Sequence, residues 1–250
     1  IYTTDTGSQS LFIFDKPNNE LKIIEGTKQQ RFVSPIDVKT DNGNNIYVTD
    51  SVLKKIFIFD KNGKFLRYFA QDFNFKRPTG LVINNIKEII YISDTVNSTI
   101  EVFTFDGKHI NTIGKYGNKN MEFNNPTFLA IDKDENIYVS DSMNQRIQIF
   151  DTNDKFIRTF GEMGKVPGTF ANPRGIAVDK DGHIFVSDTL FNAIQIFNQE
   201  GQLLMLFGKE GIDKGNFSLP AGIATKGNKI LISDSYNMRI QEFSMIEYKK

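Results

Sequence analysis

The stretch NPTFLAIDKDENIYVSDSMNQRIQIFDTNDKFIRTFG, residues 125–161, holds four short apolar runs separated by small polar clusters. Runs of this length, with Asn, Asp and Gly between them, are typical of four consecutive antiparallel strands joined by tight turns. Residues 172–208, NPRGIAVDKDGHIFVSDTLFNAIQIFNQEGQLLMLFG, repeat the pattern closely. The stretch is therefore one unit of an internal repeat.

Two columns of residues recur in a constant register along the chain. A strand-like run ends in Ser or Thr followed by aspartate six times, at Asp5, Asp50, Asp94, Asp141, Asp188 and Asp234. The successive differences of 45, 44, 47, 47 and 46 residues fall in the range of four-stranded propeller blades. A proline preceded three residues earlier by phenylalanine opens five of the units, at Pro35, Pro78, Pro126, Pro173 and Pro220.

No segment shows helical apolar recurrence over more than one turn, so we predict an all-β fold. Runs such as residues 88–93 are apolar on both sides and must be covered on both faces, as stacked blades provide. The first unit begins at its second strand and the last ends after its third, so both terminal blades should be incomplete. Residues 246–250 could form a partial outer strand.

The patterns PRGIAVD and IYVSDSMNQRIQIF, followed by a Gly-rich connection, resemble the NHL-repeat family over essentially the whole chain. The resemblance implies a six-bladed β-propeller of four-stranded antiparallel blades, in agreement with the six aspartates. We expect one domain over residues 1–250, with blades at approximately 1–26, 35–70, 78–114, 126–161, 173–208 and 220–250. Family members include protein-binding platforms, RNA-binding domains, sensor ectodomains and an amidating lyase, so the resemblance does not fix a function.

Composition narrows the partners but not the compartment. Lys plus Arg and Asp plus Glu are equal at 30 each, so no global charge attracts nucleic acid or an anionic membrane. The chain has no cysteine, which excludes disulfides and thiolate metal sites, and no apolar run approaches the ~18 residues of a membrane helix. The sequence begins at Ile1, without Met and without a signal pattern, which suggests a processed piece of a larger protein. An upstream segment could have carried an export signal, so the compartment is not assigned.

The six aspartates are interpreted as structural turn residues. A short Asp side chain at this place accepts hydrogen bonds from the backbone of its own turn. Arg146 and Arg239 each follow an aspartate by five residues, at Asp141 and Asp234, and are expected to return across the turn and pair with it. A feature repeated in several blades usually serves the blade itself.

Departures from the repeat supply the candidate binding residues. Asp37 and Phe128 stand where other units carry Gly, and Lys39 stands where they carry Val or Ala. Asp37 and Lys39 are two apart on one strand, so they point to the same side and can pair. Together with basic and turn residues nearby, they predict a ligand- or partner-binding channel mouth on the face of the Asp turns. The full set is Asp37, Lys39, Arg77, Phe128, Arg174, Phe191 and Asn192.

Three functions stay open. The first is a non-catalytic, monomeric scaffold that presents this face to a protein or peptide. The second is single-stranded RNA binding through connections that are mildly basic and carry Tyr116. The third is a metal-dependent lactonase-like or lyase enzyme using Asp37 with Asn125 or Asn172. The only histidines, His109 and His183, fall in different blades, so no catalytic residue, metal ligand or cofactor is assigned and the first function is preferred.

Overall fold

The computed structural model describes residues 1–246, which form twenty-two strands and one short 3-10 helix, η1 (Ser142–Asn144). The first eleven strands are β1 (Tyr2–Asp5), β2 (Ser10–Asp15), β3 (Glu20–Ile24), β4 (Pro35–Thr40), β5 (Ile46–Asp50), β6 (Lys55–Phe59), β7 (Phe65–Phe69), β8 (Pro78–Asn84), β9 (Ile89–Asp94), β10 (Thr99–Thr104) and β11 (His109–Ile113). The others are β12 (Pro126–Ile131), β13 (Ile137–Asp141), β14 (Arg146–Phe150), β15 (Phe156–Phe160), β16 (Pro173–Val178), β17 (Ile184–Asp188), β18 (Ala193–Phe197), β19 (Leu203–Phe207), β20 (Pro220–Lys226), β21 (Lys229–Asp234) and β22 (Arg239–Ser244).

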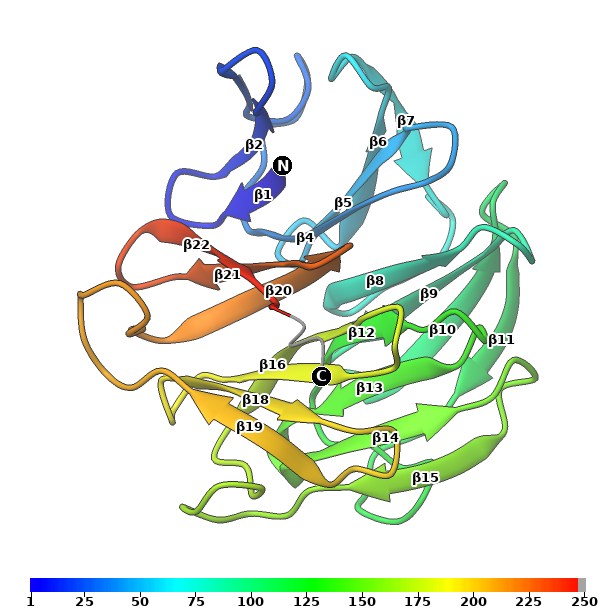
Figure 1. The fold of residues 1–250 in the computed structure, drawn as a ribbon. Coiled ribbons are helices and arrows are strands. Elements are labelled where there is room, and N and C mark those ends of the chain that lie inside the picture. The colour runs from blue at the N-terminus through cyan, green and yellow to red at the C-terminus, as the bar shows by residue number, and fades with distance from the viewer. Residues whose placement is uncertain (247–250) are drawn as a thin grey trace. The chain divides into compact units, whose positions relative to one another are not determined.

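The strands pair into six antiparallel sheets, which we call blades 1 to 6 in chain order (Figure 1). Blades 1 (β1–β3) and 6 (β20–β22) have three strands, and the four blades between them have four. Both the expected six-bladed β-propeller and its incomplete terminal blades are confirmed. Of the possible outer strand over residues 246–250, all but Ile246 lies outside the described residues.

Two compact units divide the chain, one over Ile1–Tyr116 and a second that begins at Gly117. Blades 1 to 3 belong to the first unit and blades 4 to 6 to the second. The expected single domain over residues 1–250 stays a prediction. Across residues 1–246, no helix is long and apolar enough to cross a membrane.

Strand register places the aspartates and the long connections at one end of each blade. In blade 4, Pro126 pairs with Asp141, Asp141 with Arg146, and Ile147 with Phe160. The β13–β14 turn and the connections entering β12 and leaving β15 therefore lie at the same end of the sheet. Blades 2, 3 and 5 have the same register, and blade 6 has it for its three strands. We call this end the Asp-turn edge.

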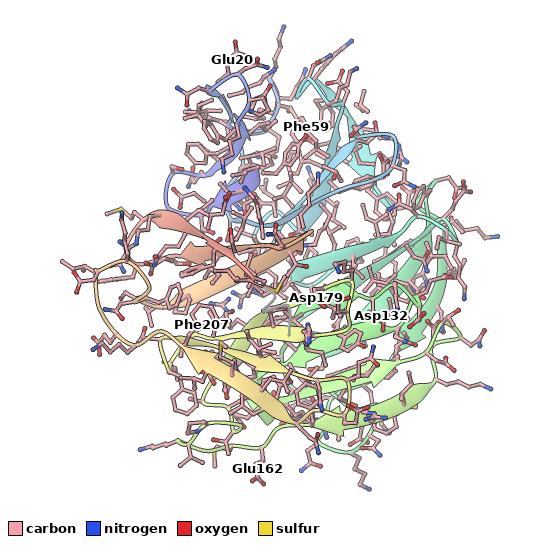
Figure 2. All side chains as sticks on the ribbon, in the orientation of Figure 1. Glu20, Phe59, Asp132, Glu162, Asp179 and Phe207 are labelled. Atoms are coloured by element: carbon pink, nitrogen blue, oxygen red, sulfur yellow. The ribbon has the colours of Figure 1, made fainter. Side chains whose placement is uncertain are left out.

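Phenylalanines of the connections fill the space between blades. The ring of Phe170 lies 6.4 Å from that of Phe160 on β15 and 5.5 Å from that of Phe197 on β18. Phe217 packs in the same way between Phe207, which is labelled in Figure 2, and Phe243. All five side chains of this column are 2% exposed or less, namely Phe32, Phe75, Phe123, Phe170 and Phe217. Aromatic burial therefore joins successive blades within each unit.

A hydroxyl group before the aspartate links neighbouring inner strands. Ser187 Oγ accepts the Gly175 N–H at 2.8 Å and donates to the Ala221 carbonyl at 2.5 Å. A Cβ atom added to Gly175 would lie 2.0 Å from that same carbonyl oxygen, so only glycine fits this approach. Blade 4 differs, because Phe128 replaces the glycine and the fully buried Ser140 Oγ has no hydrogen-bond partner among residues 1–246.

This difference predicts opposite effects for two serines that are equally buried. Ser187→Ala should lower the free energy of unfolding by about 1–3 kcal/mol, because it leaves the buried Gly175 N–H and the partly buried Ala221 carbonyl without this partner. Ser140→Ala should leave it unchanged or raise it by up to ~1 kcal/mol, because it removes an unsatisfied buried hydroxyl. Urea unfolding of both variants tests this, and an equal loss in the two would contradict it.

Candidate functional site

Each buried aspartate fastens its turn to the connection that enters its blade. Asp50 Oδ2 accepts the N–H groups of Val33 and Ser34, at 2.7 and 3.0 Å, and Oδ1 accepts those of Val52 and Leu53 in the turn. Asp188 similarly binds the N–H groups of Ala171 and Asn172 in the connection and of Phe191 in the turn. At Asp50 and Asp188 these donors are backbone groups, so the attachment does not depend on which side chains the edge displays.

Arginine extends this attachment in blades 4 and 6. Arg146 Nε lies 2.8 Å from Asp141 Oδ2, and its other nitrogens donate to the carbonyls of Asn118, Lys119 and Glu122. Arg239 makes the equivalent pair with Asp234 at 2.7 Å and donates to carbonyls of the connection before blade 6. Both expected ion pairs are present.

Local differences give the aspartates different acidities. Burial raises the pKa of Asp141, and the opposing bonds from Asn124, Asn144 and Arg146 do not reverse this. Burial likewise raises the pKa of Asp188, whose turn has no arginine. At Asp234 burial acts in the same direction, but the hydrogen bonds from Ser218, Asn237, Arg239 and Gln241 together lower the pKa.

Three of the predicted binding residues lie in the first unit. Asp37 is 7% exposed and forms the expected ion pair with Lys39 at 2.7 Å. Its second oxygen accepts the Leu81 N–H at 3.0 Å, which joins blade 2 to blade 3. Arg77 lies in the connection before β8, where its N–H donates to Asp94 at 2.8 Å and its side chain is exposed. The carboxylate of Asp37 is thus engaged within the unit.

The other four predicted binding residues lie in the second unit. Phe128 is 8% exposed, whereas Arg174 and Phe191 are half-buried. Asn192 has a positive φ of 53° and its side-chain oxygen accepts the Leu219 N–H at 2.7 Å. Phe191 and Asn192 belong to the β17–β18 turn, and Phe128 and Arg174 to the first residues of β12 and β16. A binding role for the seven residues stays a prediction.

The position two residues after the aspartate was missed by the sequence reasoning. In blades 2 to 6 it carries an apolar side chain that is 52–74% exposed: Val52, Val96, Met143, Leu190 and Tyr236. Its apolar character is visible in the sequence, but the predicted binding residues do not include it. Blade 1 carries Gly7 instead.

The second unit adds further exposed apolar side chains at the same edge. Hydrogen bonds from Ser142 Oγ to the Pro173 carbonyl and from Thr189 Oγ1 to the Pro220 carbonyl hold the Asp-turn edges of blades 4, 5 and 6 side by side. Connections between these blades also project outward, as Glu162 shows in Figure 2. We call the following residues the apolar edge: Met121, Met143, Met163, Val166, Leu190, Ile212, Leu219, Tyr236 and Met238.

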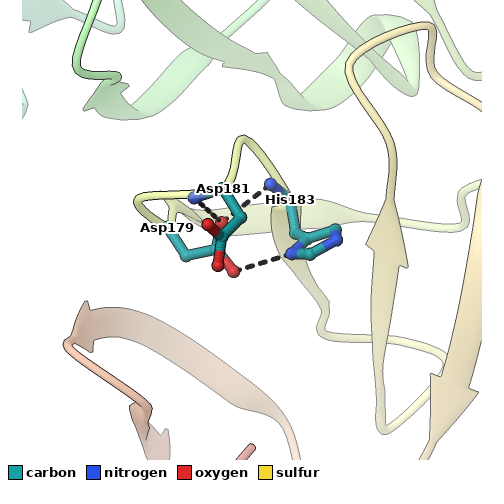
Figure 3. Close-up of side chains that lie close together, drawn as sticks. All are labelled: Asp179, Asp181 and His183. Atoms are coloured by element: carbon teal, nitrogen blue, oxygen red, sulfur yellow. Dashed lines mark hydrogen bonds and ion pairs between the residues drawn. The ribbon is translucent and has the colours of Figure 1, made fainter. Parts of the chain in front are cut away.

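One group of three potential metal-ligating side chains occurs in residues 1–246, and it lies at the opposite end of blade 5 (Figure 3). The ligand atoms of Asp179, Asp181 and His183 lie within 4.8 Å of one another. Asp179 Oδ1 accepts the backbone N–H groups of Asp181 and His183. Its Oδ2 lies 2.8 Å from His183 Nδ1. Asp132 makes the same bonds with Asn136 in blade 4. Hydrogen bonding within the hairpin therefore accounts for this cluster.

Comparison with known families identifies the repeat. A family model described as a 6-bladed beta-propeller matches residues 70–147 and 133–205, together 70–205, which is more than half of the 250 residues. A model described as an NHL repeat matches residues 217–243. None of the curated proteins matches the chain in sequence.

Solved structures share the fold at low sequence identity. A streptogramin B lyase has a TM-score of 0.68 and 18% identity, covering 98% of this chain and 79% of its own. A catalytically inactive virginiamycin B lyase from Staphylococcus aureus with quinupristin has a TM-score of 0.67 and 18% identity. The match covers 97% of this chain and 80% of the lyase. A chain of a nidogen/laminin complex has a TM-score of 0.67 and 17% identity. The match covers 82% of this chain and 74% of that one. At these identities the likeness shows the fold alone.

The pKa directions predict opposite pH effects for two aspartates. The lowered pKa of Asp234 contributes stability that is present above its ordinary value of 3.8 and lost as the pH falls through the folded value. The raised pKa of Asp188 has the opposite effect. As the pH falls, the folded protein binds a proton at Asp188 before the unfolded chain does, so this group stabilises the folded state on acidification. Asp234→Asn should therefore reduce the acid-induced loss of unfolding free energy, and Asp188→Asn should increase it.

Urea unfolding at pH 6, 5, 4 and 3.5 measures these slopes. The unchanged protein should lie between the two variants in its loss of stability on acidification. A smaller loss in Asp188→Asn than in Asp234→Asn would show that the assigned directions are wrong.

Proposed function

Because the chain belongs to the six-bladed β-propeller family and carries an NHL repeat, we propose that it is a non-catalytic binding domain whose Asp-turn edges receive a protein or peptide partner. One observation carries the proposal: the apolar edge of the second unit displays nine exposed large apolar side chains. Exposed apolar side chains gathered on one edge favour an interaction site, whereas single scattered ones are common on any surface.

The chemistry of the edge favours peptide recognition. Four of the chain's six methionines belong to it, and flexible thioether side chains adapt to varied apolar partners. Tyr236, 74% exposed at a turn tip, adds an aromatic group of the kind that dominates binding energy at interfaces. The aspartates already fix the backbone around these side chains, so binding a partner costs little free energy for ordering the loops.

Catalysis has no comparable support in the described residues. The imidazoles of His109 and His183 each bond to a carboxylate of their own blade, at 2.8 Å in both cases. Asp37, the carboxylate of the metal-enzyme alternative, is held by Lys39 and by the N–H groups of Val38 and Leu81. The alternative of single-stranded RNA binding is supported by Tyr116, which is 72% exposed in the connection before blade 4 and whose ring could stack on a base.

Selection of peptides from a displayed random library against the purified protein tests the proposal. The selected peptides should be rich in apolar and aromatic residues. The double variant Leu190→Glu, Tyr236→Glu should weaken their binding at least about tenfold, because it places charges at two turn tips of the apolar edge. Isothermal titration calorimetry gives the dissociation constants.

Met205→Glu is the matched control, since Met205 is 55% exposed in the same unit but lies on the outer strand β19. It should leave peptide affinity unchanged. Equal weakening by the control, or no peptide selected at all, would refute the proposal. Salt-dependent binding of single-stranded RNA without peptide binding would favour the RNA alternative instead.

A further inference from the structure

Blade 3 departs from the repeat at three positions that contact one another. Glu101 occupies the β10 position where blades 4, 5 and 6 carry glutamine, and His109 opens the outer strand where blades 2, 4 and 5 carry Phe or Leu. Thr99 stands where two other blades carry arginine. The equivalents are Gln148, Gln195 and Gln241 for the first, Phe65, Phe156 and Leu203 for the second, and Arg146 and Arg239 for the third.

These residues form one hydrogen-bonded network around a buried carboxylate. Glu101 is 3% exposed, and its oxygens accept the hydroxyls of Thr99 and Thr112, each at 2.7 Å. His109 Nε2 lies 2.8 Å from Glu101 Oε2. Burial of a carboxylate is costly without such partners, so Glu101 and His109 depend on each other.

A shorter connection explains why this network differs from its counterparts. Gln148 binds the connection before blade 4, through the Met121 N–H and the Glu122 carbonyl. The connection before blade 3 covers only residues 70–77, whereas the one before blade 4 covers 114–125. Glu101 instead binds His109 and Thr112 of its own outer strand.

An open cavity of about 530 Å³ lies beside His109 and is lined by residues of the first unit alone. It lies between β7, the start of the 70–77 connection and the β10–β11 turn. Phe73 and Phe103 form an aromatic wall with His109, their rings 4.8 and 5.1 Å from the imidazole. Its volume is in the range of small-molecule sites.

Polar groups in this cavity have capacity for a ligand. Arg67 lines it, donates one hydrogen bond to the Phe105 carbonyl at 2.9 Å, and has no carboxylate partner among residues 1–246. The Lys108 side chain is a second cation in the lining. With Nε2 of His109 held by Glu101, its Nδ1 has no hydrogen-bond partner in the described part of the chain. In the neutral imidazole that donates Nε2–H to Glu101, Nδ1 is an acceptor.

We propose that this cavity binds a small aromatic carboxylate. The ring packs against Phe73 and His109, and the carboxylate binds the Arg67 guanidinium, which offers a planar pair of donors. Lys108 adds a second positive charge to the lining, which also contains the carboxylates of Asp72 and Asp106. Asp106, on the rim, is engaged by the Thr104 hydroxyl and does not occupy Arg67. The site is separate from the apolar edge, so it stands or falls independently of the proposed peptide binding.

Nuclear magnetic resonance of the imidazoles tests the site, because the chain has only two histidines. Phenylacetate, phenylacetamide and phenethylamine serve as anionic, neutral and cationic probes of the same ring. Phenylacetate should shift the His109 signals saturably and leave those of His183 unchanged. The neutral and cationic probes should bind at least about tenfold more weakly, as expected for loss of one charged hydrogen-bonded contact.

Two variants and a control make the result decisive. Arg67→Gln should weaken phenylacetate binding about tenfold, whereas Arg158→Gln, at the same strand position in blade 4, should not change it. The double variant Glu101→Gln, Thr112→Val keeps His109 for observation but removes the carboxylate charge and the Thr112 hydroxyl beside its Nε2, and should also weaken binding. A His109 signal that does not saturate, equal shifts with all three probes, or full binding by Arg67→Gln would overturn the proposal.

Discussion

A buried aspartate that accepts backbone N–H groups is the interaction on which the rest of the structure depends. At Asp50, Asp94, Asp141, Asp188 and Asp234 the side chain is fully buried, and each binds the connection that enters its blade. Backbone N–H groups away from water must find acceptors, and the carboxylate supplies several at once. The aspartate thus sets where each connection meets the edge of its blade.

Packing between blades follows from that attachment. Once a connection is held at the aspartate, its phenylalanine lies over the gap between two sheets, as Phe170 does between Phe160 and Phe197. The hydroxyl before the aspartate then bonds the inner strand of the next blade, as Ser187 does with Ala221. The aspartate, the hydroxyl residue before it and the phenylalanine of the connection therefore contact the same connection or the next blade. Their mutual spacing must stay constant for these contacts to form, which explains their regular recurrence along the sequence.

The repeated residues made the fold predictable, because spacing and turn chemistry are local properties of the sequence. Prolines at strand starts, aspartates at turns and the Asp141–Arg146 pair were all expected and are present. Asp37 was harder to interpret, since its bond to Leu81 joins residues 44 apart and no local pattern reveals it. The cavity beside His109 also escaped prediction, because it arises from a shorter connection and a side chain on another strand.

The way Arg146 holds its connection has a consequence for how this protein can change over evolutionary time. Its guanidinium donates to the carbonyls of Asn118, Lys119 and Glu122, so it recognises the path of the backbone and ignores those side chains. Substitutions at such positions alter the surface while the loop keeps its shape. Recognition can therefore diverge between related chains without a matching cost in folding, provided that the aspartate and arginine beneath are retained.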